Sequence, residues 1–148
     1  MRKLLLLLLF IPLVSFGQDE LKYFNKGKKS FEKENYDKAA AYLNNALELN
    51  PSYVDAHFYT GLLNTKLKQY DKAISNYNKV LELDLNNELA YLNRGRINYI
   101  LKNIEAAQSD FKNAIEIDSI FFEAYDSLVL VSESLKDYDT GILAINKV

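Results

Sequence analysis

The chain has no cysteine and no tryptophan, and only one histidine and one methionine among its 148 residues. Without cysteine, no disulfide can stabilise the fold in an oxidising compartment, and no lipid can be attached to make a lipoprotein. A single histidine, His57, excludes metal sites that need several imidazole or thiolate ligands. Runs of lysine or arginine are absent and the net charge is −2, which argues against a nucleic-acid ligand.

Proline and glycine are also scarce, with two prolines and five glycines. Yet Gly27, Gly61 and Gly95 lie 34 residues apart, and the residues around them recur with the same period. A glycine inside a helix is unfavourable by roughly 0.5–1 kcal/mol relative to alanine, so three in phase indicate a packing requirement. The small residues Ala39, Ala73, Ala107 and Gly141 form a second such column. These columns predict pairs of helices that cross closely.

The pattern within each 34-residue unit is that of an α-helix. Apolar residues recur at three- and four-residue spacing, as in Ala73, Tyr77 and Val80. Four polar stretches interrupt the pattern, and each ends in an acid that can cap the next helix or complement its dipole. Pro51 stops the first helical pair. The sequence therefore predicts eight helices of roughly 10–14 residues. The four acids are Asp37, Asp71, Glu105 and Asp139.

This pattern resembles the tetratricopeptide repeat, a 34-residue helix–turn–helix unit. The resemblance covers the chain after about residue 19 and implies an all-α, right-handed α-solenoid. Three full repeats and one truncated repeat are expected, at residues 20–53, 54–87, 88–121 and 122–148. The fourth departs from the pattern, with Val129 in place of glycine. The motif residues are Gly27, Gly61, Gly95, Tyr36, Tyr70, Tyr138, Ala39, Ala73, Ala107, and the strings 46–51 and 80–84.

Catalytic chemistry is not predicted. His57 occupies a column filled by tyrosine in the other units, which favours a packing role. Glu48, Glu82 and Glu116 share one repeat column, which is typical of a solvated helix surface and not of an acid–base pair. No Gly-rich phosphate loop, nucleophile elbow or EF-hand loop occurs. We therefore expect a protein that is not an enzyme and needs no cofactor or metal.

Residues 1–17 have the pattern of a secretory signal peptide. Arg2 and Lys3 precede an apolar stretch, and small residues stand before Gln18. The apolar stretch is too short for a typical membrane span of around 20 residues. The alternative is an uncleaved signal anchor. Together with the composition, the pattern predicts an exported bacterial protein, periplasmic or secreted, without membrane insertion after cleavage.

In the resembled family, the first helix of each repeat lines a concave groove that binds proteins. The resemblance implies a groove here with apolar anchors and spaced cations, as binding hot spots require. The alternative is that some of these aromatic residues pack between neighbouring repeats. The expected groove residues are Phe24, Lys28, Phe31, Phe58, Leu62, Lys66, Leu92, Arg96 and Tyr99.

Family members that bind chaperone tails hold a carboxylate with a clamp of Lys, Asn and Arg. That clamp is missing here, since its five positions hold other residues, so chaperone-tail binding is not predicted. The function implied is a non-enzymatic interaction module or scaffold of the bacterial envelope, binding an extended or helical protein segment. The clamp positions hold Phe24, Lys28, Tyr59, Leu89 and Asn93.

The alternative function is a self-associating structural subunit. Ile142, Ile145 and Val148 lie three residues apart and share one helical stripe. No following repeat covers this stripe in the sequence. We therefore expect the last helix to fray or to pair with another molecule, most simply in a symmetric homodimer.

Overall fold

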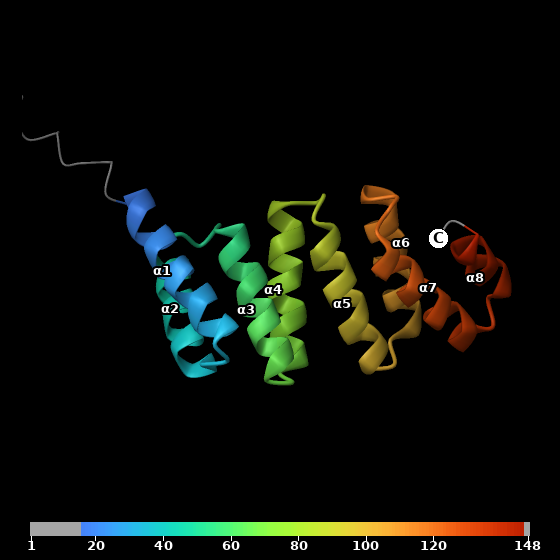
Figure 1. Ribbon diagram of the computed structural model, residues 1–148, viewed down its shortest axis with the longest axis horizontal. Helices are drawn as coiled ribbons and strands as arrows, with labels where there is room; N and C mark the ends of the chain where they lie inside the picture. Colours follow the sequence, from blue (N-terminus) through green and yellow to red (C-terminus); the bar gives the residue numbers. More distant parts are fainter. Residues whose placement is uncertain (1–15, 147–148) are drawn as a thin grey trace, which may run out of the picture. The chain divides into compact units, whose positions relative to one another are not determined.

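The computed structural model describes residues 16–146, which form eight α-helices and no strands (Figure 1). Most of the predicted signal peptide therefore lies outside the described residues, although Phe16 and Gly17 belong to the first helix. None of the described helices has the length and apolar character needed to cross a membrane. The helices are α1 (Phe16–Glu32), α2 (Tyr36–Leu49), α3 (Val54–Lys66), α4 (Tyr70–Leu83), α5 (Glu88–Ile100), α6 (Ile104–Ile117), α7 (Phe122–Leu135) and α8 (Tyr138–Ile145).

The predicted all-α repeat architecture is confirmed. Helices α4 and α6 begin at Tyr70 and Ile104, 34 residues apart, and α5 and α7 begin at Glu88 and Phe122 with the same spacing. We propose that the repeats divide at the first residues of α3, α5 and α7. Helix α8 is the shortest, with eight residues.

The chain forms two compact units, the first ending at Ala56 and the second starting at His57. In the first unit, α1 packs on α2, and the Phe24 ring lies 5.1 Å from the Tyr53 ring between centroids. In the second unit, α5 pairs with α6 and α7 with α8, and α7 also packs on α6. The core of these four helices includes Phe111, Val131 and Ala144, each at most 3% exposed.

The glycine column marks the close crossings that the sequence predicts. A Cβ atom on Gly61 would lie 2.7 Å from Cε1 of Tyr77, and one on Gly95 would lie 2.7 Å from Cε1 of Phe111. At Gly27 the corresponding contact is 2.9 Å to Cγ of Leu43. Each glycine therefore makes room for the large side chain that fills the hairpin core.

The turns within the hairpins are built by non-glycine residues. Glu34, Lys68, Lys102 and Lys136, one per repeat, have φ between 56° and 66°. This left-handed conformation ends the first helix of each pair. The predicted capping acids lie in the first turn of the next helix, where they complement its dipole. Where a side-chain cap is formed here, Asn35 or Asp137 provides it.

Burial gives Tyr77 an unusual alkaline titration. Desolvation raises the pKa of this fully buried phenol from 10.0 to about 12, although its hydrogen bond with Thr65 acts in the opposite direction. The unfolded phenol ionises near pH 10. Its contribution to stability is therefore complete below pH 10 and is lost as the pH rises to about 12.

Between pH 10 and 12, we expect the free energy of unfolding to fall less in Tyr77→Phe than in the wild type, because phenylalanine has no ionisable hydroxyl. Thermal unfolding at pH 8, 10 and 11 measures this difference. An identical alkaline loss in both proteins would show that Tyr77 titrates like an exposed tyrosine.

Candidate protein-binding surface

Two of the three expected groove residues of the first unit are at least partly accessible. Lys28 and Phe31 are half-buried, and the Phe31 ring lies 6.0 Å from that of Tyr36. Phe24 is only 7% exposed and packs on Tyr53. Its side chain stabilises the hairpin, and the surface proposed below leaves it out.

In the second unit, α3 contributes Phe58, Leu62 and Lys66. Phe58 and Leu62 are half-buried and Lys66 is exposed. The Phe58 ring stands edge-on to Tyr77 of α4, with 5.8 Å between centroids. Phe58 thus belongs partly to the hairpin core, and of the three residues Lys66 alone is exposed.

Helix α5 contributes Leu92, Arg96 and Tyr99. Leu92 is 1% exposed and belongs to the core, so it offers no surface to a partner. Arg96 is exposed, and its Nη2 donates to Oε2 of Glu123 on α7 at 3.1 Å. Tyr99 is half-buried, with the Lys102 ammonium 5.7 Å from its ring centroid. The accessible faces of α5 and α7 are therefore linked by a charge pair.

A buried charge pair that the sequence analysis did not predict lies between α5 and α6. Arg94 donates from Nε and Nη2 to the Asp110 carboxylate at 3.1 and 2.6 Å, and Asn98 donates to the same carboxylate at 3.1 Å. The Asp110 side chain is 5% exposed. Arg94 also donates to Asn78 of α4 at 2.6 Å. Three helices are joined by this network. The other repeats do not pair a cation with an acid in these two columns, so no periodic signal reveals it.

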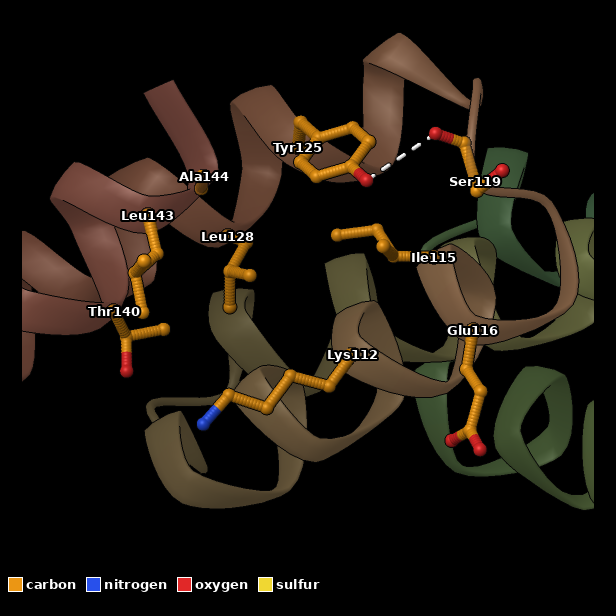
Figure 2. A pocket seen from close by; sticks show the side chains of 9 residues that line it. All are labelled: Lys112, Ile115, Glu116, Ser119, Tyr125, Leu128, Thr140, Leu143 and Ala144. Atoms are coloured by element: carbon orange, nitrogen blue, oxygen red, sulfur yellow. Dashed lines mark hydrogen bonds between the residues drawn. The ribbon is translucent and has the colours of Figure 1, made fainter. Parts of the chain in front are cut away.

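An apolar cleft of about 420 Å³ lies between α6, α7 and α8 (Figure 2). Ile115, Leu128 and Leu143 point into it, and the aliphatic chain of Lys112 runs along one edge. The Tyr125 hydroxyl donates to the Ser119 carbonyl at 3.2 Å on the opposite edge. This cleft could not be predicted from the sequence either, because none of its lining residues belongs to the expected groove.

The last helix exposes most of its large apolar side chains. Ile142 is 55% exposed and Ile145 is 59% exposed. Val148, the third residue of the predicted self-association stripe, lies outside the described residues. Leu143, at 65% exposed, adds a third apolar side chain on this eight-residue helix.

His57 makes the kind of contact expected for a packing residue. It is half-buried, and its Nδ1 lies 3.4 Å from Oδ1 of Asn76. Within residues 16–146 no group of three or more potential metal ligands comes together.

Comparison with known proteins agrees with the repeat pattern. Tetratricopeptide repeat family models match residues 24–88 and 89–121. A crystal structure of MamA is 26% identical over 88% of this chain and 72% of that chain, with a TM-score of 0.81. The first tetratricopeptide domain of Spaghetti (RPAP3), solved with an HSP90 peptide, is 26% identical over 80% and 94%, with a TM-score of 0.77.

A third similar structure, Pseudomonas aeruginosa pilF, is 24% identical over 89% of this chain and 60% of that chain, with a TM-score of 0.78. This likeness bears on the fold alone. No curated protein sequence matches the chain significantly.

Proposed function

Because the chain belongs to the tetratricopeptide repeat family, whose members are generally protein-interaction scaffolds, we propose that it is a non-enzymatic interaction module of the bacterial envelope. It binds an extended or helical protein segment along the accessible faces of its first helices. In the second unit these are α3 and α5, which carry Leu62, Lys66, Arg96 and Tyr99. The observation that carries the proposal is that each of these helices has a half-buried apolar side chain about one turn from an exposed cation.

The charge pair on α5 and α7 supports this proposal. Arg96 and Glu123 are 47% and 64% exposed at the side chain. An ion pair between exposed groups contributes only about 0–1 kcal/mol in water. The guanidinium can therefore exchange Glu123 for a carboxylate of a partner at little energetic cost, while Leu62 and Tyr99 supply apolar contact area.

The partner is proposed to differ from a chaperone tail. The RPAP3 domain was solved with the peptide SRMEEVD of HSP90. At the family's clamp positions this chain has Tyr59, Leu89 and Asn93, together with Phe24 and Lys28. Only one of these five residues carries a positive charge, which is too little to hold a carboxylate as that clamp does.

Export is part of the proposal and rests on the sequence of residues 1–17. The positively charged start, the short apolar stretch and the small residues before Gln18 support a signal peptide. The site of action is then periplasmic or extracellular.

Loss of the accessible anchors tests the binding surface. We expect Leu62→Ala with Arg96→Ala to weaken partner binding by about 2–4 kcal/mol, because an apolar anchor and a cation are lost together. The measurement is recovery of the partner from envelope extract by the immobilised protein, with circular dichroism to verify folding. Glu82→Ala, on the exposed face of α4, is the matched control. Equal recovery by wild type and double variant would exclude this surface.

A second candidate function, self-association, is favoured by one observation. Ile145 occupies the repeat column of Leu43, Tyr77 and Phe111. Those three side chains are at most 1% exposed, whereas Ile145 is 59% exposed. The side chain at this repeat position is buried in the other repeats but exposed on α8. A symmetric dimer would cover it.

A further inference from the structure

The cleft between α6, α7 and α8 has a filled counterpart one repeat earlier. Leu128 and Ala144, which line the cleft, occupy the repeat columns of Arg94 and Asp110. In the earlier repeat, the Arg94 side chain spans from Asp110 to Asn78 across the equivalent helices. In the last repeat, a shorter leucine faces an alanine. The cleft thus lies where two smaller, uncharged side chains replace a bridging ion pair.

The replacements also change the chemistry of the cleft. Ser109 of the earlier repeat becomes Leu143, and Asn78 becomes Lys112. The floor is apolar, with Leu128 5% exposed and Tyr125 2% exposed. Lys112 stretches along one edge, while the Glu116 carboxylate points away from it (Figure 2). Lys112 already has an acid of its own chain nearby, since hydrogen bonds from Thr140 and Gln108, and then the Lys112 ammonium, lower the pKa of the Asp137 carboxyl. Lys112 is exposed, so it can also face an acid of an occupant. An occupant with apolar side chains and a negative charge near Lys112 would therefore fit the cleft.

Helix α8 carries this combination on its own surface. Ile142 and Ile145 are exposed, and Asp139 lies in the first turn of the same helix, also exposed. Because α8 borders the cleft, two copies related by a twofold axis can each place α8 in the cleft of the other. Such an isologous contact uses the same patch twice and closes on itself.

Helix α1 offers no surface that matches α8. In the last three repeats, one first-helix column holds Ala56, Ala90 and Ala124, all fully buried. In α1 that column holds Lys22, and Lys26, Lys29 and Lys33 follow it on the same helical face. All four lysines are exposed. This charged face disfavours apolar head-to-tail stacking of α1 on α8.

We propose that α8 of a second copy of this chain docks in the cleft between α6, α7 and α8, and that both copies do so reciprocally. Ile142 and Ile145 of each copy cover Leu128 and Leu143 of the other. Lys112 of each copy pairs with Asp139 of the other. The inference rests on the proposed self-association and adds where the second copy binds; partner binding on α3 and α5 does not depend on it.

Sedimentation velocity over a concentration series tests the proposal on the chain purified as its host processes it. We expect a monomer–dimer equilibrium. Lys112→Glu alone and Asp139→Lys alone should each raise the dimer dissociation constant about tenfold, because like charges then face each other. The double variant should return to within about threefold of the wild type, since the pair is restored with reversed signs. Both substituted residues are exposed.

Filling the cleft gives an independent test. Leu128→Arg with Ala144→Asp rebuilds the pair of the earlier repeat and should raise the dissociation constant about tenfold or more. If that variant unfolds, Leu143→Lys at the exposed edge replaces it. Leu130→Lys, exposed on α7 outside the cleft, is the control and should dimerise normally.

Three results would overturn the proposal. If the wild type stays monomeric at high concentration, neither the contact in the cleft nor the proposed self-association exists. A dimer unaffected by the charge reversals shows that the copies meet elsewhere. A dimer broken by Leu130→Lys places the contact on α7, away from the cleft.

Discussion

Arg94→Ala is expected to lower the free energy of unfolding by about 3–5 kcal/mol, the cost of leaving a buried charge without its partner. Asp110, whose side chain is 5% exposed in the wild type, would keep only the hydrogen bond from Asn98. Arg94 also loses its contacts with Asn78 of α4 and with the Tyr91 ring, 5.4 Å away. Urea unfolding followed by circular dichroism measures the change.

The next repeat provides the matched control. It carries Leu128 and Ala144 in the columns of Arg94 and Asp110. Arg94→Leu with Asp110→Ala should therefore recover most of the stability that Arg94→Ala loses, since no charge is left buried. If the double variant is less stable than the single one, the ion pair is not the origin of the effect.

Gly61→Leu is expected to destabilise the fold by about 1–3 kcal/mol or more through overpacking. Even the first atom of a new side chain would lie 2.7 Å from the Tyr77 ring, which is fully buried and has no room to move. The expected result is a melting temperature several degrees below the wild type.

Two milder substitutions control for the change of residue type. At Gly141, a Cβ atom would lie 3.4 Å from Cβ of Ser132, an almost ordinary contact, so Gly141→Ala should be far less costly. Val129→Leu, at the glycine column of the fourth repeat, should also be mild because a branched side chain is already accommodated. If Gly61→Leu has the same melting temperature as the wild type, the repeat register is wrong.

The elements that recur in all repeats could be predicted from the sequence. The glycine column predicted the close crossings because only a missing side chain allows Tyr77 and Phe111 to approach the backbone. The helical periodicity likewise predicted eight helices. A sequence pattern that recurs with a fixed period is strong evidence, since accidental matches do not stay in phase.

Features specific to one repeat could not be predicted in this way. The counterparts of Arg94 and Asp110 in the next repeat are Leu128 and Ala144, which carry no charge. The repeat pattern therefore predicts neither the hydrogen-bond network nor the cleft. The groove positions taken from the family also included Leu92, which is 1% exposed here. Position in the repeat indicates which helix face a residue lies on, but burial depends on the neighbouring side chains. The surface left for partners is smaller than the predicted one.

Photo-crosslinking in the living host shows directly whether a partner binds the first helices of the repeats. A photoreactive residue is placed singly at Leu62 or Tyr99, on the proposed binding surface, or at Glu82 or Lys72, on the exposed face of α4. We expect the same protein to be crosslinked from Leu62 and from Tyr99 and from neither of the α4 positions. Crosslinking from α4 alone, or no protein shared by Leu62 and Tyr99, would contradict a binding surface on the first helices.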